Sequence, residues 1–325
     1  MKIDKDAVFL YSENARGKIK EIAMRLKKSS QRVKYSLAVL EKEKVVYNPY
    51  CIFDYSHLGL ILFRVYFKGG YIGDNDTKAI RNTLNNNPYL LSMYELSGEF
   101  DLVLEIAVPN PSRFNKELRK MTSQIPSLNT YKILLNVVTH IYPRSYLSKN
   151  LLGKNQEPSI IIGGDREIEN FSPKEMAVLK HLLDKPTQRL TTLSEQANLN
   201  IKTVMSTLHE LQHRKTIRGF RFIIDHNQLG INKFRLFLKL HNYTEEGENQ
   251  LMSYLLKTKE IVQVNKTVGD WNMEVDLETP DKVRMRLVVS EIRENFKDLI
   301  ETFNIMEFYR YYKKSYLPTY LFEQA

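Results

Sequence analysis

The sequence predicts an α+β fold in which one unit, three helices followed by an α/β domain, occurs twice. Shifting the chain by 171 residues aligns 63–68 with 234–239 without a gap, which indicates an internal repeat. In each half, three short helical patterns precede a segment in which apolar spacing changes from 3.6 toward 2 residues. A chain of 325 residues also exceeds a single compact core and suits roughly two to four domains.

The repeat extends over nearly the whole chain. The same shift places Leu58-Gly59 on Leu229-Gly230 and Gly98 on Gly269, and near the ends 145–147 matches 315–317 at a shift of 170. Between the halves, 148–170 mixes glycine, proline and charges, as linkers do. The predicted domains are winged helix-turn-helix units at 1–55 and 171–226, α/β domains at 56–147 and 227–325, and the linker at 148–170.

The first half begins with helical patterns at 4–11 and 18–26, and Ser29 or Ser30 is expected to cap a third helix that ends near Lys42. Three short helices in about 40 residues are typical of a helix-turn-helix unit. Residues 45–47 and 50–53, joined through Asn48-Pro49, are expected to form a two-stranded wing. The outward side chains of the third helix are predicted to contact DNA: Ser30, Gln31, Arg32, Lys34, Tyr35 and Ser36.

The second half repeats this arrangement with fewer cations. Ser172-Pro173 begins its first helix, Pro186 ends it, and Asn200 caps the third helix. The predicted DNA contacts of this copy lie on its third helix and on its wing: Lys202, Thr203, Ser206, His209, Arg218 and Arg221.

After each wing the predicted order of elements is β-α-β-β-α-β. The first strands are expected at 60–68 and 233–240, and the last at 130–141 and 303–312. The two middle strands of each domain flank Gly98 or Gly269. This order predicts a ferredoxin-like split βαβ domain.

The amino-acid composition narrows the classes of partner and of site that are expected. The net charge is +10, and residues 1–160 hold 24 Lys and Arg against 15 Asp and Glu, so a polyanionic partner and a more basic first half are expected. No apolar stretch reaches the length of a membrane helix, and the charged start lacks a signal-peptide core, which predicts a cytoplasmic protein. Cys51 is the only cysteine, which excludes an internal disulfide and a cysteine zinc cage.

Several local motifs together resemble the Lrp/AsnC (feast/famine) family of transcription regulators. They are Ile3-Asp4, Asn14-Ala15-Arg16, Glu21-Ile22-Ala23, the run 40–46 and 98–102 in the first half, and 211–217 and 269–273 in the second. The resemblance covers nearly the whole chain twice. It implies two winged helix-turn-helix units, each joined to a ferredoxin-like (RAM-type) effector domain, as in archaeal-type regulators, and double-stranded DNA as the partner.

The resemblance also implies a small-molecule effector, such as an amino acid, bound between α/β domains that pair back to back. The residues matching that position are Gly98, Glu99, Phe100, Asp101, Gly269, Asp270, Trp271 and Asn272. Because Asn272 replaces Asp101 in the second copy, the two sites are expected to differ. Tight turns would explain the two glycines at least as well as effector binding does. Core packing would likewise explain the two aromatic residues. We expect the halves to form a pseudo-twofold dimer within one chain, and further homo-oligomers stay open.

No catalytic residue, metal site or cofactor is predicted. His209 and His213 form the only short histidine doublet and lack a third ligand, and no phosphate loop or nucleophile elbow occurs. Two alternatives remain. The same architecture resembles siroheme decarboxylases, for which His140 and His241 would face a tetrapyrrole cavity between the α/β domains. A degenerate copy that only binds protein would instead show no salt-dependent affinity for DNA.

Overall fold

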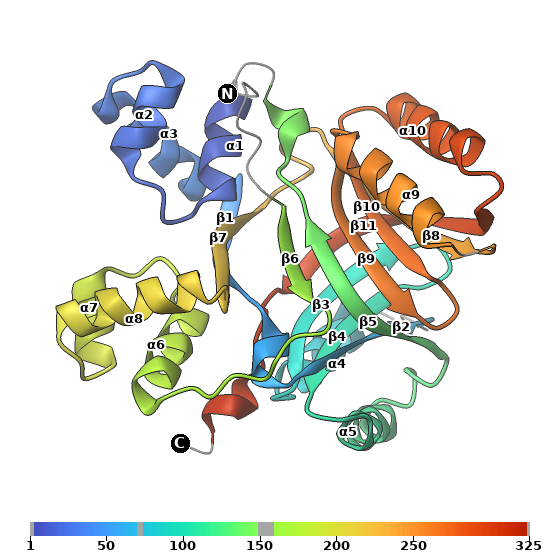
Figure 1. The fold of residues 1–325 in the computed structure, drawn as a ribbon, viewed down its shortest axis with the longest axis horizontal. Coiled ribbons are helices and arrows are strands. Elements are labelled where there is room, and N and C mark those ends of the chain that lie inside the picture. Colours follow the sequence, from blue (N-terminus) through green and yellow to red (C-terminus); the bar gives the residue numbers. More distant parts are fainter. Residues whose placement is uncertain (1–2, 70–73, 149–158, 243, 324–325) are drawn as a thin grey trace.

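The computed structural model describes residues 3–69, 74–148, 159–242 and 244–323. Two three-helix units lie on one side of the molecule, and a closed barrel of strands with four flanking helices lies on the other (Figure 1). The order of helices and strands is the same in both halves, and the α+β class predicted from the sequence is confirmed.

The first three-helix unit consists of α1 (Lys5–Glu13), α2 (Ile19–Leu26) and α3 (Ser30–Lys42). The Ser29 hydroxyl accepts the Arg32 N–H at 3.3 Å and so caps α3, as predicted. The buried face of α3 carries the predicted apolar stripe: Val33, Leu37 and Leu40.

The second unit consists of α6 (Pro173–Asp184), α7 (Leu190–Gln196) and α8 (Ile201–His213). A capping box between Ser172 and Glu175 begins α6. The Asn200 side chain accepts the Thr203 N–H at 2.8 Å and begins α8. These caps lie where the sequence predicts them.

The predicted two-stranded wing of the first half is wrong. Residues 46–53 form one strand, β1 (Val46–Phe53), which pairs with β7 (Ile217–Ile224) of the other half. Asn48 adopts a φ of 41°, and the register shifts beside it, so Asn48-Pro49 forms a bulge within the strand instead of a hairpin turn. Pro49 has no N–H for a ladder, and the bulge removes the need for one.

This two-stranded ribbon lies on a pseudo-twofold axis. Val46 lies opposite Ile224, and Phe53 lies opposite Ile217. The repeat makes Val46 equivalent to Ile217 and Phe53 to Ile224, so exchanging the halves leaves these two end pairs unchanged, although the register shifts between them. The ribbon therefore holds the two three-helix units in equivalent positions about one axis.

The barrel contains four strands from each half. They follow the order β2-β4-β3-β11-β8-β10-β9-β5, and β5 pairs back to β2 and closes the ring. Each last strand joins the halves, because β5 pairs with β9 and β11 pairs with β3. The bounds are β2 (Ile61–Phe67), β3 (Leu90–Ser97), β4 (Leu102–Val108), β5 (Tyr131–Ile141), β8 (Asn232–Leu240), β9 (Ile261–Val268), β10 (Met273–Thr279) and β11 (Ile300–Lys313).

One linker strand and four helices surround this ring. In the linker, β6 (Ile160–Gly163) adds to β5. The helices α4 (Asp74–Asn85) and α5 (Pro111–Gln124) belong to the first α/β unit, and α9 (Glu245–Lys257) and α10 (Lys282–Asn295) to the second. Apolar side chains on the outer faces of the strands pack against these helices and form one core in each half. Within the described ranges, no helix is both long and apolar enough to cross a bilayer.

Candidate nucleic-acid interface

The N-terminal half of α3 presents its polar side chains to solvent. Five of the six predicted contact residues there are exposed, and Ser36 is half-buried. Tyr35 is 73% exposed, which is unusual for a tyrosine in a packed domain. The exposed residues are Ser30, Gln31, Arg32, Lys34 and Tyr35.

The equivalent face of α8 is also accessible. Lys202, Ser206 and His209 are exposed, whereas Thr203 is half-buried. The Ser206 hydroxyl donates to the Thr203 carbonyl oxygen at 2.9 Å, a bond within its own helix. Figure 1 shows α3 and α8 on the same side of the molecule, one on each side of the β1–β7 ribbon. The structure thus presents two polar helix faces related by the pseudo-twofold axis.

The two arginines predicted on the second wing do not belong to this surface in the same way. Arg221 is 5% exposed and forms an ion pair with Glu13 of α1, so the prediction that it contacts DNA is wrong. Its position on β7 in the paired ribbon turns it inward, because no separate wing hairpin forms. Arg218 is half-buried, and burial lowers the pKa of its guanidinium.

The two glycine turns predicted to bind an effector pack against the opposite half. Both glycines have a φ of +144°. A Cβ on Gly269 would lie 2.7 Å from the Leu134 side chain and 2.9 Å from the Ile133 carbonyl oxygen, whereas a Cβ on Gly98 would lie 3.3 Å from Met306. Close approach and backbone conformation therefore explain both glycines without a ligand.

Asp101 and Asn272 make the same bond in the two halves. Asp101 accepts the Gly69 N–H at 2.8 Å, and Asn272 accepts the Leu240 N–H at 2.9 Å. Gly69 and Leu240 are themselves equivalent in the repeat. The expected difference between the two sites does not extend to this interaction, because an amide oxygen accepts an N–H as a carboxylate does.

One lysine brings together two of the remaining predicted effector residues, Glu99 and Asp270. Lys132 on β5 lies 3.5 Å from the Glu99 carboxylate and 3.3 Å from the Asp270 carboxylate. Phe100 is buried, and Trp271 packs 5.8 Å from the ring of Phe237 in the barrel core. The two turns thus meet at one end of the barrel, and their effector role remains a prediction.

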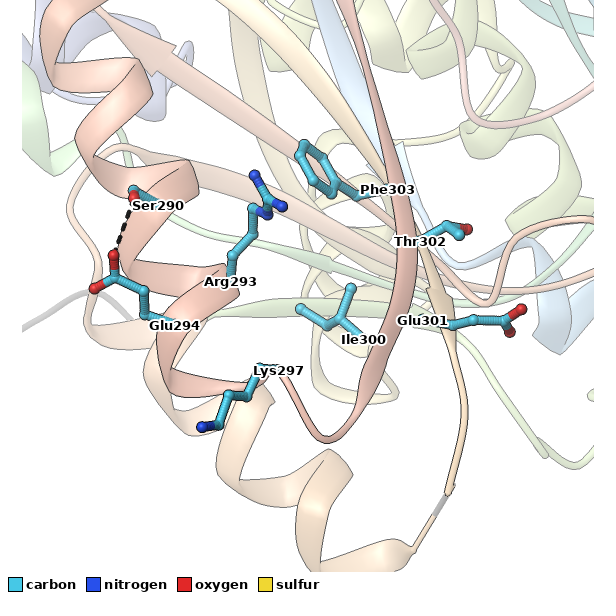
Figure 2. Close-up of a pocket in the computed structure, with 8 residues that line it drawn as sticks. All are labelled: Ser290, Arg293, Glu294, Lys297, Ile300, Glu301, Thr302 and Phe303. Atoms are coloured by element: carbon cyan, nitrogen blue, oxygen red, sulfur yellow. Dashed lines mark hydrogen bonds between the residues drawn. The ribbon is translucent and has the colours of Figure 1, made fainter.

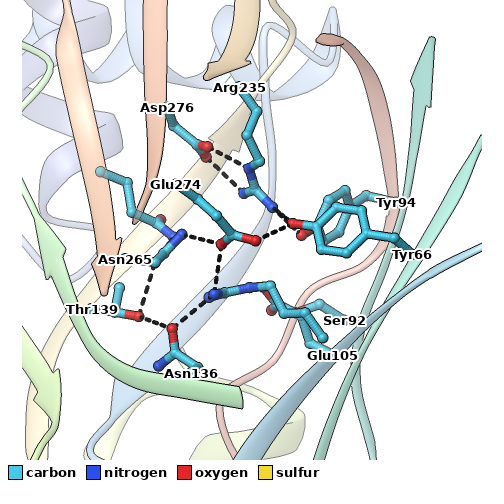
Figure 3. Close-up of polar contacts among 12 residues, drawn as sticks. Tyr66, Ser92, Tyr94, Glu105, Asn136, Thr139, Arg235, Asn265, Glu274 and Asp276 are labelled. Atoms are coloured by element: carbon cyan, nitrogen blue, oxygen red, sulfur yellow. Dashed lines mark hydrogen bonds and ion pairs between the residues drawn. The ribbon is translucent and has the colours of Figure 1, made fainter. Parts of the chain in front are cut away.

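Inside the barrel, two arginines at equivalent repeat positions form a buried polar network (Figure 3). Arg64 donates to Glu105 at 2.8 Å, and Arg235 donates twice to Asp276 at 2.6 and 3.0 Å. Glu105 and Asp276 are also equivalent in the repeat. Each arginine is therefore neutralised by the neighbouring strand of its own half.

Glu274 joins this network across the two halves. Its carboxylate accepts from the Arg64 guanidinium at 2.8 Å, from the Asn265 amide at 2.9 Å and from the Tyr66 hydroxyl. Burial alone would lower the pKa of Arg64, but the charges of Glu274 and Glu105 hold it well above its ordinary value. Burial raises the pKa of Tyr66, which keeps its hydroxyl protonated as a donor. The network thus fixes the first half against the second.

Sequence reasoning missed this network, although a signal was present. In β10 the acidic residues alternate with apolar ones, and the same alternation places Lys233 and Arg235 on one face of β8. An antiparallel sheet with helices on one face normally turns its charges to solvent. Here the charged face is buried because the two sheets close on each other: Glu274, Asp276 and Glu278 are 0% exposed.

The described part of the chain has an open groove of about 620 Å³ between α10 and the start of β11 (Figure 2). Arg293 lies over the Phe303 ring at 4.5 Å, and Lys297 lies at the end of the groove. None of the predicted effector or DNA-contact residues lines it. Within the described residues, no group of His, Cys, Asp and Glu is arranged to hold a metal ion.

Comparison with known proteins gives a sequence relationship over part of the chain and a structural likeness over nearly all of it. No family model matches the chain. The HTH-type transcriptional regulator FL11 of Pyrococcus horikoshii is 30% identical over 126 residues, which are 38% of this chain and 75% of that regulator. The crystal structure of the siroheme decarboxylase NirDL matches 98% of this chain and 94% of its own, with a TM-score of 0.57 and 13% identity.

The complex of the same decarboxylase with an iron-uroporphyrin III analogue gives a TM-score of 0.56 at 13% identity. At this identity the likeness shows a shared fold alone. The sequence relationship goes further, because three quarters of the archaeal regulator is covered. The chain therefore belongs to the Lrp/AsnC-type family of HTH-type transcriptional regulators.

Proposed function

We propose that this protein is a sequence-specific DNA-binding transcription regulator that acts as a pseudo-dimer within one chain. The observation that carries the proposal is the exposure of the polar faces of both α3 and α8, on one side of the molecule and about one pseudo-twofold axis. Helix-turn-helix dimers insert such helices into successive major grooves of a duplex. The exposed cations Arg32, Lys34 and Lys202 would bind the phosphate backbone.

The barrel interior favours this function over tetrapyrrole chemistry. Among the described residues, the network around Arg64 and Arg235 occupies the space between the halves, and an enclosed cavity beside it is about 20 Å³. That volume admits about one water molecule, whereas sites for ligands of drug size span roughly 300–1,000 Å³. On β5, Thr139 faces the interior, so His140 next to it faces outward, and His241 lies just beyond the end of β8. Neither histidine lines that cavity.

The proposal is tested by the salt dependence of binding to fragments of the organism's own promoter DNA, measured by fluorescence anisotropy. Each lost phosphate contact lowers the slope of log K against log salt by about 0.9. We expect the double variant Arg32→Ala/Lys34→Ala to bind more weakly and to reduce the slope by about 2. Added siroheme should produce no shifted absorption band.

The matched control removes two exposed lysines from the helical side of the second α/β unit. Lys257 ends α9, and Lys297 follows α10. Lys257→Ala/Lys297→Ala lowers the net charge by the same amount and should leave the slope unchanged. If both double variants lower the affinity equally, binding follows net charge and α3 is not the reading helix.

A further inference from the structure

A buried charged cluster with residues from both halves surrounds Glu278 of β10. This carboxylate accepts from the Arg144 guanidinium at 3.1 Å and from the Tyr146 hydroxyl at 2.6 Å. His226 lies 3.0 Å away through Nε2, and the Lys233 ammonium lies at 3.5 Å. The cluster is therefore organised by one carboxylate that is 0% exposed.

A second carboxylate completes this cluster. Arg144 also donates to Glu13 at 2.9 Å, and Glu13 in turn pairs with Arg221. Arg144, which follows the last barrel strand of the first half, thus has two carboxylate partners. Such pairing is what a buried guanidinium requires, because an uncompensated charge in the interior is strongly destabilising.

The pseudo-symmetric position, where the end of the second half meets β4 of the first, lacks both partnerships. Lys314 takes the place of Arg144, and Tyr316 that of Tyr146, at the shift of 170 that applies near the ends of the halves. At the shift of 171, Ala107 replaces Glu278, and the exposed Asp184 replaces Glu13. No carboxylate of the described residues forms an ion pair with Lys314, whose ammonium donates a hydrogen bond to the Tyr311 hydroxyl at 3.3 Å.

Lys314 borders two spaces, of which the smaller is also lined by the Glu105 carboxylate. Lys314 and Tyr311 line the enclosed cavity of about 20 Å³ on one side. The same two residues line an open groove of about 560 Å³ on the other side, whose volume lies within the range of small-molecule sites. The groove lies between β11, the bulge of β1 and the segment after α6, and its charged lining residues are Asp184, Lys185, Lys313 and Lys314.

We propose that this groove binds a small carboxylate-bearing molecule, whose carboxylate pairs with Lys314 as Glu278 pairs with Arg144 in the other half. Three lysines against one aspartate favour an anion. Aromatic rings already surround the ammonium, with Tyr311 at 4.5 Å and Tyr50 at 5.0 Å, so an entering carboxylate meets a cation shielded from water.

The electrostatics of the site agree with this assignment. Burial lowers the pKa of Lys314, the neighbouring Tyr311 raises it in part, and the charges of Lys233 and Arg144 lower it; the net pKa lies below the ordinary value. Burial also lowers the pKa of Lys313. A bound carboxylate would relieve both effects, because an opposite charge at hydrogen-bonding distance favours the charged form of a lysine.

Acetate is the probe, titrated at constant ionic strength against chloride and followed by amide NMR shifts. We expect saturable shifts confined to 184–188 and 311–315. Lys314→Met keeps the apolar stem and should weaken acetate binding at least about tenfold. Ala107→Glu supplies the carboxylate from within and should abolish acetate binding, with the melting temperature checking its fold. Lys297→Met, in the groove of Figure 2, should change nothing.

The inference is overturned if acetate and chloride give the same unsaturable shifts in the parent protein. It is equally overturned if Lys314→Met binds acetate as tightly as the parent does. Lys314→Met decides the question if Ala107→Glu does not fold. DNA binding is not part of this readout, so its failure would leave the acetate result standing.

Discussion

Replacing Glu274 by leucine probes the network that joins the two halves. The substitution leaves the Asn265 amide and the Tyr66 hydroxyl without their acceptor, and Arg64 without its partner from the opposite half. Breaking a buried ion pair costs roughly 3–5 kcal/mol. Arg64 keeps its hydrogen bonds to Glu105 at 2.8 Å and to Asn136 at 2.7 Å. We therefore expect the free energy of unfolding to fall by about 3 kcal/mol, the lower end of that range.

Urea unfolding at pH 7 measures this loss, and the double variant Arg64→Met/Glu274→Leu separates pairing from packing. If the two side chains act as a pair, the double variant should lose about 2 kcal/mol less than the sum of the single variants. Glu301→Leu, on an exposed residue of β11, should stay within about 0.5 kcal/mol of the parent. A Glu274→Leu loss below about 1 kcal/mol, or strict additivity, would refute the account of the barrel interior.

Three further results follow from the same structure. Burial raises the pKa of Asp276, but Arg235 and Lys233 outweigh it and lower the pKa to about 2; this depressed carboxyl stabilises the fold above pH 3.8. As the pH falls from about 4 to 2, about 2 kcal/mol of that stability should be lost in the parent and not in Asp276→Asn, measured by denaturant titration at each pH. Gly269→Ala should be destabilised by about 1 kcal/mol more than Gly98→Ala, since both have a φ of +144° but only the former meets backbone at 2.9 Å; equal melting temperatures would contradict this. Lys202→Ala should lower the salt slope of DNA binding by about 1, and an unchanged slope would show that α8 does not contact phosphate.

The sequence predicts local elements well and pairings between distant strands poorly. The caps at Ser29, Ser172 and Asn200 depend only on residues that are neighbours in the sequence. The helices α3, α6 and α8 therefore begin where expected. The ribbon of β1 and β7 joins residues that lie 178 positions apart at one end, Val46 and Ile224, and 164 positions apart at the other, Phe53 and Ile217. No local sequence pattern predicts such a pairing. Asn48-Pro49 has the composition of a hairpin turn, and this led to the wrong prediction of a wing.

The candidate interface was partly predictable for the same reason. Exposure along α3 follows from helical periodicity, because the apolar stripe fixes which face is buried. The burial of Arg221 depends on Glu13, which lies in α1 of the other half, and nothing near Arg221 in the sequence indicates it. In the sequence, charged residues alternate with apolar ones along β8 and β10. The burial of these charges, however, depends on closure of the barrel.

Hydroxyl-radical footprinting at defined stoichiometry tests the central claim most directly. If one chain reads DNA through both α3 and α8, one molecule per duplex should protect two tracts about 10 base pairs, or a multiple, apart. The variant Arg32→Ala/Lys34→Ala should weaken protection of one tract more than the other. A single protected tract at one chain per duplex, or two tracts that require two chains, would contradict the account.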